Sequence, residues 1–267
     1  MPGTISRRES IGAAFGRARD YDAHARVQAR AALRLAQAVA ALDLPPRPRV
    51  LEIGCGTGFL TQALAKAMPA AQLLITDLAP AMVERARERV GEAPSREFAV
   101  LDGEHGPMPM AGHFKRAGPF DLIVSSLTFQ WFDDLAGAAE RLCGWLAPGG
   151  HLVFSTLASG TFAEWRAAHA SLGLEPGTLP FPTAAALGAM VLGHKAAEPV
   201  ITHDTESYGG ARAFLAALKG IGAATPRPGH NPLPPGALRR VAAAFDQAGA
   251  HVTYEIAICH YRRKEQA

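Results

Sequence analysis

Short apolar runs alternate with amphipathic stretches through the first 160 residues of the chain. The apolar runs predict five strands, at 50–54, 71–78, 96–102, 120–126 and 151–156. Segments with helical spacing lie between them, at 59–68, 79–90 and 134–146. A further helix is expected at 22–43, before a run of prolines that cannot continue it. Strands that alternate with helices predict a parallel sheet covered on both faces.

This rhythm breaks after Thr156. Two helical patterns, at 161–174 and 183–193, flank a proline-rich joint and predict an insertion over the sheet. The remaining segments read as a strand, a helix, a proline-rich loop, a helix and a strand, at 200–208, 210–223, 225–236, 236–248 and 251–261. We therefore expect a single domain over 1–267, with an N-terminal helical segment at 1–48 and a helical insertion at 157–197 over the active site.

Composition restricts the classes of partner. The chain has 267 residues, of which 48% are hydrophobic and 19% charged, and its net charge of +3 is too small to indicate nucleic acid by itself. Cys55, Cys143 and Cys259 lack the spacing of a metal site, which favours reduced thiols and no metal. No apolar run reaches membrane length. We expect a soluble cytoplasmic protein with no nucleic-acid or membrane partner; the sequence indicates no oligomeric state.

The stretch RVLEIGCGTGFL, residues 49–60, is the strongest sign of a ligand. Gly54, Gly56 and Gly58 follow a strand and precede a helix, where glycine lets the backbone turn tightly and approach a ligand. The spacing is G-x-G-x-G, and Phe59 stands where the dinucleotide fingerprint has its third glycine. Two nucleotide-containing cofactors fit, NAD and S-adenosylmethionine.

Acidic residues after neighbouring strands favour the second of these. Asp77 ends the second strand and can accept from both ribose hydroxyls, while Asp102 ends the third and can accept from the adenine amino group. Leu78 and Met82 can sandwich the adenine ring. Glu52 would repel a pyrophosphate but suits an ammonium group. Structural roles stay open, because Glu52 or Asp77 can cap a turn or helix and Met82 can be core.

Four motifs together resemble class I S-adenosylmethionine-dependent methyltransferases: LEIGCGTG, the Asp of ITDLAPAM, LDGE, and LAPGG before the fifth strand. This resemblance covers about residues 49–157. It implies an α/β fold with a Rossmann-like, mostly parallel sheet, an antiparallel C-terminal strand and a helical insertion after the fifth strand. The residues then expected at S-adenosylmethionine are Glu52, Gly54, Cys55, Gly56, Gly58, Asp77, Leu78, Met82, Asp102, Gly103, Glu104 and Ser126.

A narrower resemblance runs nearly from end to end. FGRARDYDAHARVQ, SSLTFQWFDDL, LVFSTLASGTFAEWRAAHASLG and LKGIGAATPRPGHNPL resemble the malonyl-acyl-carrier-protein O-methyltransferase family. The resemblance implies methyl transfer to the free carboxylate of a malonyl thioester on acyl-carrier protein, giving the methyl ester that starts pimeloyl synthesis for biotin. The alternatives are a methyltransferase of a small free carboxylic acid, a binding protein that has lost catalysis, and an RNA or quinone methyltransferase.

The expected chemistry needs no general base, because a carboxylate is already ionised at neutral pH. His24, His169 and His230 are the best-placed histidines, and we expect them to be structural or hydrogen-bond donors. Candidates for holding the malonyl carboxylate are Arg166, Arg227 and His230. Tyr21, in a short break between two helical segments, can close over the cofactor. Gln130 and Trp131 follow the fourth strand, where class I substrates usually lie.

Basic residues crowd both ends of the chain, and carrier proteins are acidic. Arg26, Arg30 and Arg34 recur every fourth residue and therefore share one face of the expected helix. This face is a candidate docking patch for the carrier protein; a solvated stripe of charge is the alternative.

Overall fold

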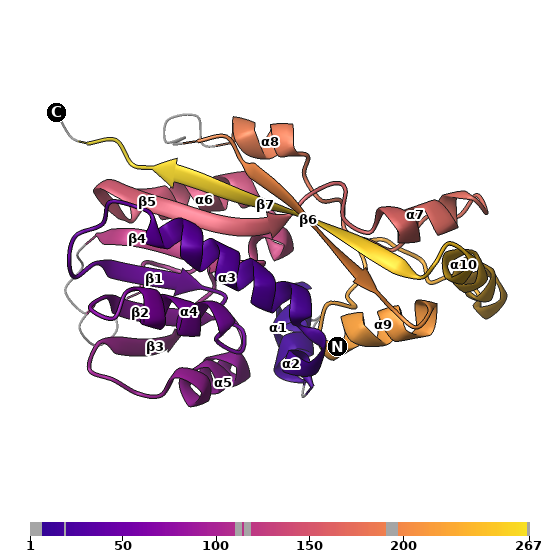
Figure 1. Ribbon diagram of the computed structural model, residues 1–267, viewed down its shortest axis with the longest axis horizontal. Helices are drawn as coiled ribbons and strands as arrows, with labels where there is room; N and C mark the ends of the chain where they lie inside the picture. The colour runs from indigo at the N-terminus through magenta and orange to yellow at the C-terminus, as the bar shows by residue number, and fades with distance from the viewer. Residues whose placement is uncertain (1–6, 19, 110–113, 115–118, 191–196, 266–267) are drawn as a thin grey trace, which may run out of the picture. The chain divides into compact units, whose positions relative to one another are not determined.

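The computed structural model describes residues 7–18, 20–109, 114, 119–190 and 197–265 (Figure 1). The chain forms two compact units, each built from separate stretches of sequence. Unit 1 comprises Met1–Ala25, Leu157–Ala184 and Ile201–Ile256, and unit 2 comprises Arg26–Thr156, Ala185–Val200 and Ala257–Ala267. The boundaries divide the expected N-terminal segment at Ala25 and the expected insertion at Ala184.

Seven strands form one sheet in the order β3-β2-β1-β4-β5-β7-β6. Their bounds are β1 Arg49–Ile53, β2 Gln72–Asp77, β3 Arg96–Val100, β4 Phe120–Ser126, β5 Leu146–Leu157, β6 Val200–Ser207 and β7 His251–Arg262. The first five strands pair in parallel. β7 is antiparallel to β5: Arg263, directly after the end of β7, donates from its N–H to Gly150 O near the start of β5, whereas Ala158, directly after the end of β5, donates to Glu255 O near the start of β7. The predicted fold class is confirmed.

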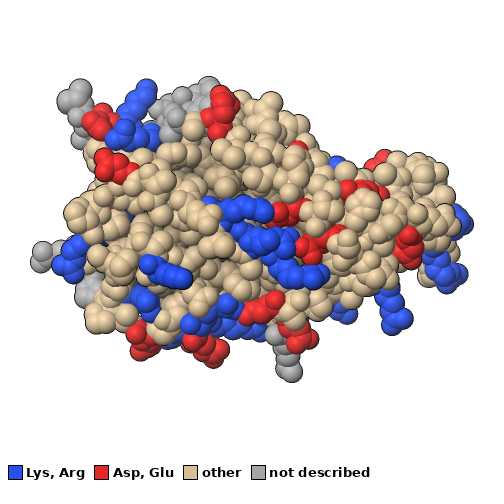
Figure 2. Space-filling model, in the orientation of Figure 1, with Lys and Arg blue, Asp and Glu red and all other residues tan. Residues whose placement is uncertain are grey.

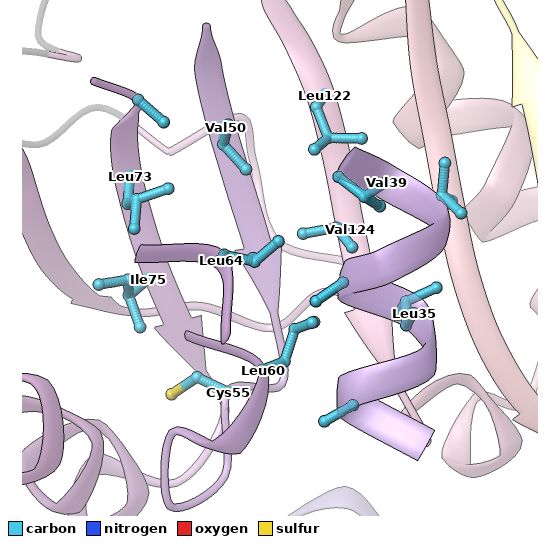
Figure 3. Close-up of a cluster of buried hydrophobic side chains, with 14 of the residues drawn as sticks. Leu35, Val39, Val50, Cys55, Leu60, Leu64, Leu73, Ile75, Leu122 and Val124 are labelled. Carbon is cyan, nitrogen blue, oxygen red and sulfur yellow. The ribbon is translucent and has the colours of Figure 1, made fainter. Parts of the chain in front are cut away.

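Unit 2 contains the parallel core. Its helices are α3 Arg26–Ala40, α4 Phe59–Ala67, α5 Pro80–Val90 and α6 Leu135–Gly144. Val50–Ile53 of β1 and Leu73–Thr76 of β2 are buried without interruption, as expected of strands covered on both faces. Figure 3 shows α3 and α4 side chains packed over strand residues; it labels Leu35, Val39, Leu60, Leu64, Val50, Leu73, Ile75, Leu122 and Val124. This packing gives the strand ends a rigid base.

The single helix expected at 22–43 is two helices. α2 spans Tyr21–His24 and α3 begins at Arg26, after the fully buried Ala25, whose N–H donates to Asp22 O. Tyr21 is therefore the first residue of α2 and does not lie in a break between helices, which corrects that prediction. Another helix, α1 Arg7–Gly16, precedes it. Alanine carries no sequence signal for a break, so only packing reveals this one.

The fifth strand is longer than the expected 151–156, and LAPGG is part of it. β5 begins at Leu146, with an irregularity opposite β4 where Phe120 pairs with Leu146 but Leu122 pairs with His151. Pro148 has no N–H to donate and lies within that irregularity. Gly149 N–H donates to Arg263 O at 3.0 Å, so pairing with β7 extends the strand.

Unit 1 has a core of aromatic rings. Phe214 of α9 (Ala211–Gly220) stacks on Phe245 of α10 (Pro235–Gln247), with ring centroids 5.7 Å apart. Trp165 of α7 (Ala163–Ala170) meets both rings edge-on, at 5.5 and 5.3 Å. In the stretch expected to be an insertion, the described residues include α7 and α8 Ala184–Ala189, while residues 191–193 of the second predicted helix lie outside the described residues.

All three cysteines are free and buried. Within the described part of the chain, none of the helices has the length and apolar character needed to cross a membrane. Among the same residues there is also no group of three or more His, Cys, Asp or Glu side chains that could hold a metal ion.

Candidate cofactor site

The glycine turn between β1 and α4 adopts backbone conformations that favour glycine. Gly54, Gly56 and Gly58 have φ of 71°, 53° and 89°. A Cβ on Gly54 would lie 2.7 Å from Thr128 Cβ and closer still to the other Thr128 side-chain atoms, so space as well as φ requires glycine there. Thr128, which sequence analysis did not single out, also donates from Oγ1 to Gly54 O at 3.3 Å.

The register of the sheet brings the expected cofactor residues to one edge. Ile53, the last residue of β1, pairs with Thr76, and Glu52 pairs with Val124 of β4. The carboxyl ends of β1, β2 and β4 therefore lie side by side, and ligands of open α/β sheets bind beyond such ends. Asp102 lies two residues after the end of β3 rather than in the strand.

Asp77 bridges the glycine turn and the start of α5. Its Oδ2 accepts from Gly56 N–H at 2.9 Å and its Oδ1 accepts from Ala79 N–H at 2.8 Å. Burial raises the pKa of Asp77, and these backbone hydrogen bonds oppose that rise. The helix-capping alternative is not observed, because the N-cap of α5 is Ala79 and no side chain caps that helix; Asp77 instead holds the backbone on both sides of it. Each carboxylate oxygen has a second lone pair, so acceptance from ribose hydroxyls stays a prediction.

Glu52 is a buried acid directly below the turn, with 2% of its surface exposed. Its Oε2 accepts from Thr61 Oγ1 of α4 at 2.7 Å, whereas its Oε1 has no hydrogen-bond partner among the described residues. Burial raises the pKa of Glu52 to about 7, a rise that the Thr61 hydrogen bond opposes and the charge of Asp77 increases. Burial also raises the pKa of the neighbouring Cys55 thiol, which therefore stays protonated.

The loop after β3 is held by its own side chains. Asp102 Oδ1 accepts from the N–H groups of Glu104 and His105, at 2.9 and 3.0 Å. A Cβ on Gly103 would overlap Ile53 Cγ2, so this loop approaches β1 too closely for a larger residue. These contacts fix where the Asp102 carboxylate stands, and its contact with adenine stays a prediction.

Glu104 is fully enclosed, and its observed contacts are structural. Its Oε1 accepts from Asp133 N–H at 2.8 Å and from Asp134 N–H at 2.7 Å, just before α6. Arg141 of α6, another residue that sequence analysis missed, donates to Gly103 O at 2.7 Å. Together they tie the loop after β3 to the segment after β4. A direct contact of Glu104 with the cofactor stays a prediction.

The other expected cofactor residues differ in exposure. Met82 of α5 is 1% exposed and belongs to the core, as the structural alternative allowed. Leu78, which follows β2, is half-buried. Ser126 ends β4 and accepts from Ser155 Oγ at 3.3 Å.

The segment after β4 turns sharply before its short helix. Leu127 has a φ of 48°, and a 3-10 helix, η2, spans Phe129–Trp131. Gln130 Nε2 donates to Leu127 O at 2.7 Å, which fixes one end of its side chain, while its buried Oε1 has no partner among the described residues. Trp131 is half-buried. Both remain candidates for contact with an acceptor substrate.

The remaining substrate candidates lie in unit 1. Arg166 donates to Ser159 O at 2.7 Å and to Thr161 O, so both terminal nitrogens of its guanidinium hold the chain's own loop. It is neither a freely solvated charge nor fully available to a ligand. Among the described residues, the Arg227 side chain donates one long hydrogen bond, from Nε to Pro176 O at 3.4 Å.

The best-placed histidines also lie in unit 1, packed against backbone. The rings of His24 and His230 lie against Gly220 and Gly177, where an added Cβ would overlap them. His169 is buried, its Nδ1 lies 2.9 Å from Trp165 O, and burial lowers the pKa of its imidazole. These contacts suit the structural roles expected of them.

Comparison with known proteins finds similarity to methyltransferases. A family model described as a methyltransferase domain matches residues 51–152. The biotin biosynthesis bifunctional protein BioCD of Bordetella avium is 44% identical over 255 residues, 95% of this chain but 52% of that protein, so the chain spans about half of that relative. Malonyl-[acyl-carrier protein] O-methyltransferase of Magnetococcus marinus is 38% identical over 264 residues, 98% of this chain and 95% of that protein.

Solved structures show the same fold at low sequence identity. Phosphoethanolamine N-methyltransferase 2 of Haemonchus contortus, in complex with phosphomonomethylethanolamine and S-adenosylhomocysteine, superposes with a TM-score of 0.57 and 17% identity. The match covers 100% of this chain and 62% of that one. At this identity, the likeness establishes the fold alone.

Proposed function

The chain belongs to the malonyl-[acyl-carrier protein] O-methyltransferase family, and we propose that it methylates the free carboxylate of a malonyl thioester carried on acyl-carrier protein. The methyl donor is S-adenosylmethionine, and the product is the methyl ester that starts pimeloyl synthesis for biotin. One observation carries this proposal: the similarity to the Magnetococcus enzyme spans 98% of the chain, whereas the methyltransferase domain by itself matches only residues 51–152.

The residues at the strand ends fit S-adenosylmethionine better than NAD. Glu52, Asp77 and Asp102 place three carboxyl groups on or next to the ends of β1, β2 and β3. This acidic set suits a cofactor with a ribose, an ammonium group and a sulfonium, and opposes the pyrophosphate of NAD. The positive φ angles at Gly54, Gly56 and Gly58 give the tight turn after β1 that such a ligand requires, while at Gly54 the space of an added Cβ is taken by Thr128.

We assign binding and orientation to this chain, and no proton transfer. When bound, S-adenosylmethionine supplies an electrophilic methyl group. A carboxylate acceptor is ionised at neutral pH, so the protein has to align it and exclude water rather than deprotonate it. His24, His169 and His230 pack against backbone in unit 1, and their expected roles include none as a general base.

Among the candidates for the malonyl carboxylate, Arg227 is the strongest. A guanidinium has five N–H donors and binds a carboxylate with two parallel hydrogen bonds. Arg166 already uses both terminal nitrogens on Ser159 and Thr161, whereas the Arg227 side chain donates a single bond of 3.4 Å, through Nε, to the described residues. The guanidinium of Arg227 is therefore better suited to bind the substrate carboxylate than that of Arg166.

The proposed docking surface for the carrier protein is the α3 arginine row, Arg26, Arg30 and Arg34. Basic side chains follow one another along α3 in Figure 2. Arg26 is exposed and the other two are half-buried, and all three have partners within the molecule. Attraction to an acidic carrier therefore has to compete with existing contacts, and we assign the largest part of it to Arg26.

Mass spectrometry tests the proposed reaction directly. Malonyl-carrier protein is incubated with the enzyme and S-adenosylmethionine, and we expect the acyl group to gain one methyl. Acetyl-carrier protein, which has no free carboxylate, is the matched control and should stay unmodified. Faster methylation of free malonate than of the carrier-bound group would instead support the small-acid alternative.

A further inference from the structure

We propose that Arg89 is a positioning residue that holds the glycine turn in the conformation that binds the cofactor. This inference rests on the proposed function, because it takes S-adenosylmethionine to be the ligand of that turn. Arg89 lies in the last turn of α5, 12 residues after Asp77 in the sequence and outside every motif that indicated the cofactor.

The Arg89 side chain contacts three consecutive residues of the turn. Its Nε donates to Thr57 O at 2.5 Å, and Nη2 lies 3.5 Å from Thr57 Oγ1. Its Cζ stands 4.2 Å from the centre of the Phe59 ring, within the range of a cation–π contact. A Cβ added to Gly58 would lie 3.3 Å from Arg89 Cδ. Hydrogen bonding, ring stacking and close packing thus converge on Thr57–Phe59.

A glycine turn needs such restraint from outside. Glycine populates positive and negative φ about equally, so three glycines in five residues leave the backbone free to leave its binding conformation. Thr128 restrains the turn at Gly54, and Asp77 restrains it at Gly56. Arg89 restrains the third part, where the turn enters α4. Preorganisation of a binding loop increases affinity because less conformational entropy is lost on binding.

A neighbouring arginine provides a matched control. Arg87 lies in the same last turn of α5 and also stands over a ring, with its Cζ 5.0 Å from the centre of Phe98. Its ion pairs, however, go to Glu84 at 3.7 Å and Glu92 at 3.9 Å, and none of these contacts touches the turn. Loss of Arg87 therefore reproduces the loss of a charge and a cation–π contact on α5, without release of the turn.

The experiment compares Arg89→Met and Arg87→Met, which keep an unbranched apolar side chain and remove the guanidinium. Calorimetry with S-adenosylhomocysteine should give a Kd about tenfold higher for Arg89→Met, the loss expected for a charge-assisted hydrogen bond, and an unchanged Kd for Arg87→Met. At saturating S-adenosylmethionine, kcat of Arg89→Met should stay within about twofold of the wild type. Arg89→Lys, which keeps a cation and donors, should recover part of the affinity.

A second measurement needs no cofactor. Hydrogen exchange at the amides of Gly58 and Gln62, which donate to Cys55 O and Gly58 O, should be faster in Arg89→Met than in Arg87→Met. Equal exchange and equal Kd in the two variants would overturn the inference while leaving the proposed function intact. If the wild type bound no S-adenosylhomocysteine at all, the proposed function would fail first, and the exchange experiment would still report on the turn.

Discussion

Replacing the buried acid Glu52 by glutamine should change how the stability of the protein depends on pH. The Glu52→Gln side chain has the same shape as protonated glutamic acid, and its amide oxygen can still accept from Thr61 Oγ1. The orphaned Oε1 becomes an amide group that never carries a charge. The variant therefore reproduces the low-pH form of the wild type at every pH.

The raised pKa of Glu52 determines whether stability increases or decreases with pH. The pKa of Glu52 is raised from its ordinary 4.5 to about 7, so the folded state binds the proton more tightly than the unfolded state. This tighter proton binding stabilises the folded state. The stabilisation is fully present below pH 4.5 and is lost as the pH rises through about 7. At about 1.4 kcal/mol per pKa unit, the wild type should lose about 3 kcal/mol relative to Glu52→Gln across that window.

Denaturant unfolding of both proteins without cofactor, at pH 5, 6, 7 and 8, measures this difference. The free energy of unfolding of Glu52→Gln minus that of the wild type should be about 1 kcal/mol at pH 5 and increase to about 3 kcal/mol at pH 8. Glu88→Gln, which removes an exposed carboxylate from α5, is the matched control at the same four pH values. A flat difference for Glu52→Gln would refute the reasoning.

Three further predictions concern the turn, the loop after β3 and the partner. Gly54→Ala should destabilise the protein by about 2–4 kcal/mol in denaturant unfolding, whereas Gly91→Ala, with a similar φ of 69° and open space around it, should cost less, because it adds backbone strain without a clash. Glu104→Ala leaves two backbone N–H groups without their acceptor and should cost about 2–4 kcal/mol, most of which Glu104→Gln recovers; equal losses would contradict the assigned role. Arg26→Glu should raise KM for malonyl-carrier protein at low salt but leave KM for a short malonyl thioester unchanged; equal effects on both would exclude docking through α3.

The sequence predicted the order and type of most elements, because each depends on neighbours along the chain. Continuous apolar runs marked β1, β2 and β4, and prolines marked the end of α3. The glycine turn was equally visible, because a backbone with positive φ at alternate positions restricts the residues it can contain. Family motifs then identified the chemistry that this turn is expected to serve.

Contacts between residues far apart in the chain decided the rest. The bond from Thr128 to Gly54 joins residues 74 apart, the bond from Arg89 to Thr57 joins residues 32 apart, and the bond from Asp133 to Glu104 joins residues 29 apart. The sequence around the glutamate of LDGE is the same whether its side chain binds a ligand or two backbone amides. An arginine near the end of a helix is usually expected to be solvent-exposed. The length of β5 likewise depends on Arg263, directly after β7, which is the hydrogen-bond partner of both Gly149 and Gly150. Local propensity determines which elements form, whereas the packing of those elements determines which partner each polar side chain meets.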